Sequence, residues 1–220
     1  MALRLAEVEP RDYLFVCTPT GDELPEMIAH WNKLGRMLGR EIQQVRPPFD
    51  LKELCHRNSA LPNWRMRFCT RALKIIPYQA WIMEHLPAVS YVGLRADEEG
   101  RVGIEWDNEA RLVTRYPLRE WGWNKDDVLD YLDCRGVSIP VRTDCARCFY
   151  QTLHEWYSLY EKHPDIYADA EAQEAEYAHT FRSPQRDTWP ADLKGLREQF
   201  ESGRIPKQRK RGEGCRMCSM

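Results

Sequence analysis

The spacing of hydrophobic residues changes along the chain, and these changes predict alternating strands and helices. A short, continuously apolar run at residues 13–17 is typical of a strand buried on both faces of a parallel sheet. From residue 24 to residue 40 the apolar positions recur at helical spacing, which predicts a helix. Residues 41–45, 89–94 and 111–117 are interpreted as three further strands.

Two more helices are expected in this part of the chain. Residues 70–86 are interpreted as helical, and Pro77 is expected to kink that helix or to divide it in two. Asn124 is a good N-cap for the second helix, and Gly136 suits the position just after its last turn. Residues 51–62 are expected to form a loop or a short helix.

The pattern becomes wholly helical from about residue 149. Strands that alternate with helices imply a parallel sheet, so the predicted fold class is α/β, with a doubly wound, mostly parallel sheet. A helical extension bounded by cysteines follows this sheet. We place the α/β domain at 1–148 and the extension at 149–220. Helices within the extension are expected at 150–162, 165–180 and 190–202.

The composition excludes several classes of protein. Hydrophobic residues make up 43% of the 220 residues and charged residues 30%, which is a globular balance. The net charge of −2 provides no bulk attraction to nucleic acid or to an anionic membrane. No apolar run approaches the ~20 residues that span a bilayer, and charges interrupt the first residues where a signal peptide needs an apolar stretch. We therefore expect a cytoplasmic protein that binds no membrane.

The placement of the eight cysteines indicates metal or redox chemistry. Cys145 and Cys148 form one Cys-x-x-Cys pair, and Cys215 and Cys218 form another. Two such pairs can complete one four-thiolate site, which would fix the C-terminal tail to the domain. Zinc and a [4Fe-4S] cluster both accept four thiolates, so the spacing does not decide between them. The alternatives are two unrelated reduced pairs and a dithiol redox centre.

The turn after the first predicted strand holds residues suited to a ligand. Open α/β sheets bind ligands beyond the carboxyl ends of their strands. At this place Gly21 lets the backbone approach a ligand, and an acidic group such as Glu23 can meet a metal or a ribose hydroxyl. The alternative is a surface turn capped by Asp22.

Charged residues gather in three further segments. Four cations lie within Arg65–Lys74, near a predicted helix start, where they suit an anion; a solvated helix face is the alternative. The loop Gly93–Arg101 follows a predicted buried strand, and its charged residues begin directly after that strand. A loop at this end of a strand is placed to contact a phosphate or sulfate group. The basic stretch 207–211 suits either the phosphates of a nucleic acid or a solvated linker.

Taken in order, these segments resemble the phosphoadenosine phosphosulfate (PAPS) reductase family, which belongs to the adenine nucleotide alpha-hydrolase-like, or pyrophosphate-loop ATP pyrophosphatase, superfamily. The resemblance covers roughly residues 10–150 and consists of four motifs. The first two match at Thr20, Gly21, Glu23, Pro25 and Glu26, and at Cys69, Thr70, Leu73 and Lys74. The others match at Gly93, Arg95, Asp97 and Glu98, and at Pro117, Leu118 and Trp121.

One departure from the family concerns phosphate binding. Family members open with a strand, a Ser-Gly-Gly-x-Asp-Ser loop and a helix, and the loop holds phosphates on backbone amides. Here Met1–Ala6 matches the tail of that helix and the loop is absent, so 1–148 would be an incomplete nucleotide-binding domain. A start codon assigned too far downstream, a split gene and a truncated paralogue each explain this. We favour the first, since a sheet without its central strand exposes unpaired backbone edges.

Two other departures count against thioredoxin-dependent sulfonucleotide reduction. Pro19 stands where the family commonly has an aspartate, and the chain lacks the C-terminal Glu-Cys-Gly-x-His motif that carries the nucleophilic cysteine. Iron–sulfur members combine a Cys-x-x-Cys, matched by Cys145 and Cys148, with two adjacent cysteines, where this chain has only Cys69. Cys215 and Cys218 are expected to substitute for that adjacent pair.

The resemblance implies an enzyme that acts on an adenylated sulfur compound or uses ATP to activate a substrate for sulfur chemistry. A thiol-redox partner would be needed for reduction. The alternatives are a sulfur-transfer or nucleic-acid-modifying relative, and a non-catalytic, metal-stabilised module whose partner supplies the phosphate loop. The residues expected to contact the nucleotide or substrate are Thr20, Gly21, Glu23, Arg71, Lys74, Arg95 and Arg101.

Overall fold

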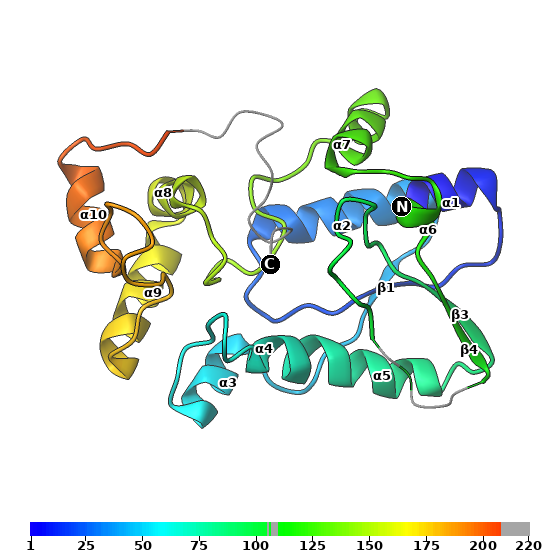
Figure 1. The fold of residues 1–220 in the computed structure, drawn as a ribbon, viewed down its shortest axis with the longest axis horizontal. Coiled ribbons are helices and arrows are strands. Elements are labelled where there is room, and N and C mark those ends of the chain that lie inside the picture. Colours follow the sequence, from blue (N-terminus) through cyan, green and yellow to red (C-terminus); the bar gives the residue numbers. More distant parts are fainter. Residues whose placement is uncertain (105, 107–109, 208–220) are drawn as a thin grey trace.

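The computed structural model describes residues 1–104, 106 and 110–207. Short strands alternate with helices in the first part of the chain, and helices alone follow (Figure 1). The strands are β1 (Phe15–Cys17), β2 (Ile42–Gln44), β3 (Ala88–Tyr91) and β4 (Leu112–Arg115). The helices are α1 (Ala2–Val8), α2 (Pro25–Leu38), α3 (Leu51–Asn58), α4 (Phe68–Thr70), the π-helix η1 (Arg71–Ile75), α5 (Ile76–Met83), α6 (Pro117–Glu120), α7 (Lys125–Cys134), α8 (Leu153–Lys162), α9 (Pro164–Tyr177) and α10 (Leu193–Glu201).

The strands form two parallel sheets of two strands each. β1 pairs with β2, with Phe15 opposite Ile42, and β3 pairs with β4, with Val89 opposite Val113. The molecule is therefore a mixed α/β structure, as the alternating pattern predicted. Within the described residues the two pairs are not hydrogen-bonded to each other, so the single doubly wound sheet expected from the sequence is not confirmed.

Local signals explain where two of the helices begin and end. The Asn124 side chain accepts the amides of Asp126 and Asp127 at the start of α7, and the Asp127 carboxylate accepts the Asn124 amide in return. Gly136 follows this helix with a φ of +64°, a left-handed conformation that glycine adopts without steric cost. Both predicted ends of the helix are confirmed. A second capping box, between Thr152 and Glu155, begins α8.

A change of helix type accommodates Pro77 within the helix predicted at 70–86. Proline lacks an amide hydrogen, and its ring collides with the carbonyl four residues earlier in a regular α-helix. The wider π-helical turn of η1 lies just before Pro77, and helical backbone continues through it into α5. The same turn carries Arg71 and Lys74, two of the predicted site residues. π-Helical turns occur frequently at functional sites.

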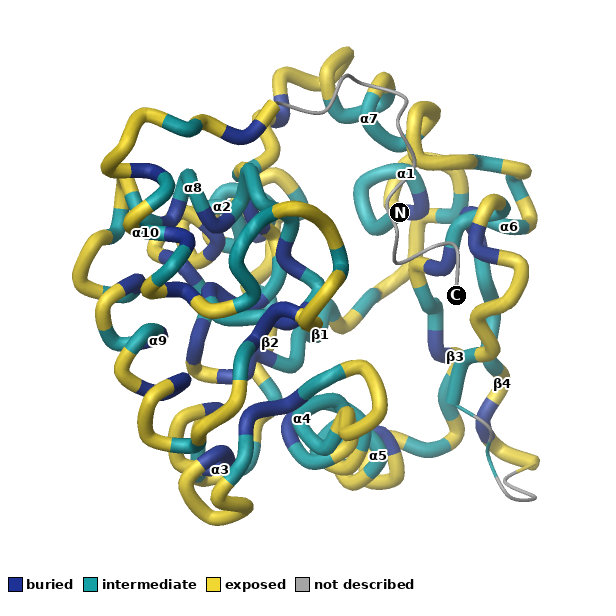
Figure 2. The backbone as a smooth tube through the Cα atoms, turned by 60° about the vertical axis from the view of Figure 1, so that its left-hand side comes forward, coloured by how far each residue is buried: buried dark blue, intermediate teal, exposed yellow. Residues whose placement is uncertain are grey.

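One buried apolar cluster joins the two parts of the chain (Figure 2). Leu24, Leu51 and Leu73 of the α/β part share it with Trp156 and Leu196 of the C-terminal helices. Side chains from both sides of residue 148 therefore pack together, and the domain boundary placed there stays a prediction. None of the described helices is both long and apolar enough to cross a membrane.

A buried glutamate, Glu174 of α9, connects the C-terminal helices through hydrogen bonds. Its side chain is buried and accepts the backbone amides of Phe181 (2.8 Å) and Leu193 (2.6 Å). Burial raises the pKa of Glu174 to about 7, because the loss of hydration outweighs these two hydrogen bonds. The folded chain therefore binds a proton at this site more tightly than the unfolded chain does.

This raised pKa predicts that folding stability falls as the pH rises. The contribution of Glu174 is fully present below the ordinary glutamate pKa of 4.5 and is lost as the pH passes 7. Two and a half units correspond to a loss of up to about 3 kcal/mol. Glu174→Gln should remove this part of the pH dependence. Below pH 4.5 the substitution should cost about 1–3 kcal/mol, since the amide nitrogen cannot accept the second backbone N–H, and this cost should shrink as the pH rises past 7.

Urea unfolding of both proteins across this pH range would check the prediction. Glu198→Gln, at an exposed position of α10, is the matched control and should keep the slope of the unchanged protein. An unchanged slope in Glu174→Gln would contradict the argument.

Candidate functional site

The turn after β1 is shaped by its own acidic side chain. One Glu23 carboxylate oxygen accepts the Thr20 amide at 2.7 Å and the Thr20 hydroxyl at 2.8 Å. The other oxygen accepts the Gly21 amide at 3.0 Å. Gly21 has a φ of +78°, and a Cβ there would lie 2.6 Å from the Cβ of Asp50. Only glycine fits this position. The hydrogen bonds of Glu23 to Thr20 and Gly21 stabilise the turn.

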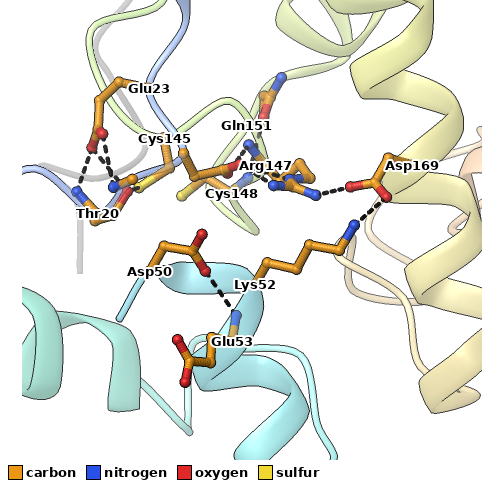
Figure 3. A network of polar contacts seen from close by, with 12 residues as sticks. Thr20, Glu23, Asp50, Lys52, Glu53, Cys145, Arg147, Cys148, Gln151 and Asp169 are labelled. Carbon is orange, nitrogen blue, oxygen red and sulfur yellow. Dashed lines mark hydrogen bonds and ion pairs between the residues drawn. The ribbon is translucent and has the colours of Figure 1, made fainter. Parts of the chain in front are cut away.

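The loop that carries the first cysteine pair packs directly on this turn (Figure 3). Glu23 and Cys145 form an isolated antiparallel bridge, and the Ala146 amide donates to the Asp22 carbonyl at 2.6 Å. The Thr20 hydroxyl lies 3.2 Å from the sulfur of Cys145. The sequence predicted two separate sites, one at Thr20, Gly21 and Glu23 and one at Cys145 and Cys148. In the structure these two segments are in direct contact.

A chain of charged side chains fixes this junction. Asp22 is buried and accepts the Arg147 amide at 3.0 Å and the Arg147 Nε–H at 2.7 Å. A second guanidinium nitrogen of Arg147 pairs with Asp169 of α9, which in turn accepts from Lys52 of α3 at 2.6 Å (Figure 3). Arg147 lies between the two cysteines of the pair. Its side chain therefore connects the cysteine loop to the turn and to two helices.

An open hollow of about 300 Å³ lies beside this junction. Carboxylates dominate its wall, so its charge does not favour an anionic group. The residues around it are Gly21, Asp22, Glu23, Ala146, Arg147, Asp165, Ile166 and Asp169.

Burial keeps the thiols of the pair protonated in the free protein. It raises the pKa of Cys145 to about 12 and raises that of Cys148 as well. Nearby cations act in the opposite direction: Lys74 lowers the pKa of Cys145, and Arg142 lowers that of Cys148. A thiol with a raised pKa is a poor nucleophile at neutral pH, whereas a bound metal deprotonates its thiols outright. The free thiols are therefore poorly suited to nucleophilic catalysis.

Arg142 is a buried cation beside the cysteine pair. Its side chain is 7% exposed, and its Nη2 atom has no hydrogen-bond partner in the described residues; Asp144 lies at 3.8 Å. Four thiolates around Zn²⁺ or an iron–sulfur cluster would carry net negative charge, which a buried guanidinium donor beside Cys148 would satisfy. The residues present at this end of the site fit such a group.

The other ligands are not assembled among the described residues. No group of three or more His, Cys, Asp or Glu side chains in the described ranges has a metal-binding arrangement. Cys215 and Cys218 lie outside these ranges. Cys69, which matches one cysteine of the iron–sulfur motif, packs against the same core, and its charge raises the pKa of Cys148. Cys69 is therefore near the pair.

The predicted anion-binding cations divide into two groups. Arg71 is exposed and Lys74 is half-buried on η1, and neither has an acidic partner within the described chain. The positive charge of Lys74 lowers the pKa of Cys145, so Lys74 lies near the cysteine loop that packs on the turn after β1. Arg95 instead pairs with Asp97 at 2.9 Å, and Arg101 pairs with the buried Glu98 at 2.6 Å. An anion at the second group would have to compete with carboxylates of the same loop.

Sequence reasoning missed the residues that hold the site together. Asp22 was interpreted as a possible turn cap, and Arg147 and Asp169 were not singled out. The only signal in the sequence was the arginine between Cys145 and Cys148, which could pair with any acidic residue. Arg119 was also missed: it donates to the carbonyls of Glu98 and Arg101, both at 2.6 Å, and closes the loop Gly93–Arg101.

The buried ion pair between Asp22 and Arg147 should make a measurable energetic coupling. Asp22→Asn or Arg147→Gln alone should destabilise the protein by about 3 kcal/mol, because each leaves the other charge buried. The double variant should lose less than the sum, with a coupling energy of about 1–3 kcal/mol. Urea unfolding of the four proteins measures this coupling.

The exposed pair Glu53–Arg57 on α3 is the matched control for that cycle. Both of its side chains are about half exposed, 48% and 52%, so its coupling should stay below about 1 kcal/mol. Equal coupling in the two cycles would show that the Asp22–Arg147 pair does not hold the junction.

No family model, curated protein or solved structure matches this chain.

Proposed function

We propose that this protein is an adenine-nucleotide-binding enzyme of the PAPS reductase type, acting on an adenylated sulfur compound or using ATP to activate a substrate for sulfur chemistry. The observation that carries the proposal is the junction at the carboxyl end of β1. There the glycine turn Thr20–Glu23, the cysteine loop and Lys74 come together. Parallel α/β folds bind nucleotides at this end of their strands.

The two cations of η1 supply the charge that an anionic substrate needs. Arg71 presents a planar fork of donors that suits a phosphate or sulfate, and Lys74 presents a point charge. The absence of acidic partners for either side chain in the described residues supports this role. Gly21 allows the backbone of the turn to lie close to the ligand.

The finer fold proposal is that the two strand pairs belong to one doubly wound sheet. Each pair is parallel, as that fold requires. Tyr13, just before β1, meets Tyr91 at the end of β3, with ring centroids 5.5 Å apart in an edge-on contact. This contact supports a common layer for the two pairs. A partner that supplies a phosphate loop to this layer is the alternative proposal.

The cofactor proposal is a four-thiolate site held by Cys145 and Cys148, with Cys215 and Cys218 as the other ligands. Buried thiols, neighbouring cations and the Nη2 atom of Arg142, which makes no hydrogen bond in the described residues, support a negatively charged centre. Zinc would supply structural cross-linking here, and an iron–sulfur cluster would in addition supply electron transfer. Arg147 would hold the turn in register with the ligand loop in either case.

Substitutions on η1 test nucleotide binding. Lys74→Ala and Arg71→Ala should each weaken binding of ATP or PAPS by roughly tenfold or more, because each removes a charged hydrogen bond. Isothermal titration calorimetry measures the affinity, and Lys194→Ala, at an exposed site on α10, is the control. If the unchanged protein binds neither nucleotide, or if all three variants behave alike, the proposed function is wrong. Binding that requires a second polypeptide would favour the alternative.

Substitutions at the cysteines test the metal site. Cys145→Ser and Cys148→Ser should each lose most of the bound zinc or iron, whereas Cys134→Ser, at an exposed position, should keep it. Metal analysis and an absorbance spectrum after anaerobic purification separate zinc from iron–sulfur. Cys215→Ser with Cys218→Ser should also lose metal. Retention in that double variant, together with loss in Cys69→Ser, would show that the tail pair is not a ligand.

A further inference from the structure

The loop Asn63–Arg67 lies in the connection between α3 and α4 (Figure 1). Its large side chains are exposed. Trp64 is 52% exposed and Met66 is 47% exposed, although tryptophan and methionine usually lose most of their surface on folding. Arg65 and Arg67 alternate with them and are exposed as well. None of these four side chains belongs to the nucleotide or thiol site described above.

Hydrogen bonds hold this loop in one conformation. The Asn63 side-chain oxygen accepts the amides of Arg65 and Met66, both at 2.9 Å. The Asn63 amide donates to the Met66 carbonyl at 3.2 Å, which closes the turn. The flanking Leu61 is fully buried and anchors the loop to the core. The exposed side chains are therefore presented by a fixed backbone, so little further ordering is needed when a partner binds.

The loop lies in a stretch of uncompensated positive charge. No acidic residue occurs between Glu53 and Glu84, and Arg65 and Arg67 have no acidic partner within the described chain. Elsewhere arginines are commonly neutralised: Arg115 pairs with Glu9 and Glu120, and Arg197 with Glu171 and Glu201. In a protein of net charge −2, this segment is a local exception and complements a polyanion.

The two arginines are also stacked on aromatic rings. The Arg65 guanidinium lies 4.6 Å from the centre of the Trp64 ring, and that of Arg67 lies 5.5 Å from the centre of the Tyr150 ring. Flat rings beside guanidinium groups form the kind of platform on which unpaired bases stack, while the cations contact the backbone phosphates. An acidic protein would need the charge but not an exposed indole. An anionic membrane would favour a continuous apolar face, whereas arginines interrupt this one.

From these features we propose that the loop Asn63–Arg67 is a binding surface for single-stranded nucleic acid. Trp64 supplies the stacking surface, and Arg65 and Arg67 supply the phosphate contacts. The surface is distinct from the cations of η1, although α4 leads directly from one to the other. Its occupation does not require a nucleotide at the proposed site, so the two proposals can fail separately.

Fluorescence anisotropy with a labelled single-stranded RNA and DNA of about 15 nucleotides tests the surface on the full chain. The unchanged protein should bind in low salt, and its affinity should fall steeply as salt rises. Trp64→Ala should weaken binding by about fivefold or more, and Trp64→Phe, which keeps a ring, should restore most of the loss. Arg65→Gln should lower the salt slope by about one contact, whereas Arg65→Lys should keep that slope.

Two exposed residues of α2 provide matched controls: Met37→Ala for the loss of an apolar side chain and Arg36→Gln for the loss of a charge. Both should bind as the unchanged protein does. Three results would overturn the proposal: no binding in low salt, equal losses in the loop and control variants, or a Trp64-independent affinity for duplex that matches the single strand. Tighter binding to vesicles of anionic lipid than to the oligonucleotide would also overturn it.

Discussion

The structure depends on one buried ion pair, between Asp22 in the turn after β1 and Arg147 in the cysteine loop. These two residues are far apart in the sequence, and each is fixed on its own side by other contacts. Asp22 lies in a turn braced by Glu23, and Arg147 also pairs with Asp169. A charge buried at such a place is costly unless it is paired. The turn and the cysteine loop can therefore adopt their positions only together.

Because of this ion pair, the cysteine pair lies on a loop that is fixed against the turn after β1. Cys145 and Cys148 flank Arg147, so any ligand they hold sits on the same short segment that supports the glycine turn. Burial raises the pKa of both thiols, and the nearby cations Lys74 and Arg142 act in the opposite direction. A metal there would strengthen a junction that already exists, rather than create one. The proposed nucleotide site and the proposed metal site therefore share the junction between the turn and the cysteine loop.

Much of the secondary structure could be predicted from the sequence, because the signals were local. The apolar run before Cys17 gives β1, and Asn124 and Gly136 mark the ends of α7. The π-helical turn before Pro77 could not be predicted, since it depends on packing as well as on the proline. The pairing of β1 with β2 and of β3 with β4 also required the three-dimensional arrangement.

The candidate site could be predicted only in part, for a related reason. Motifs identified the glycine turn and the cysteines, but no pattern indicates that residue 22 meets residue 147. Arg95 matched a motif and Arg101 was predicted as a site residue. Both are nevertheless engaged with acidic residues of the same loop, Asp97 and Glu98. The net charge of −2 also gave no indication of the exposed Trp64 beside Arg65 and Arg67, which have no acidic partner among the described residues.

The most direct test of the central claim is hydrogen–deuterium exchange with and without ATP or PAPS. If the turn, η1 and the cysteine loop are one nucleotide-binding unit, the ligand should slow exchange together in residues 20–23, 71–75 and 145–148. Exchange in α10, which contributes no polar side chain to the junction, should not change. Protection confined to one of these segments, or found only elsewhere in the chain, would contradict the account.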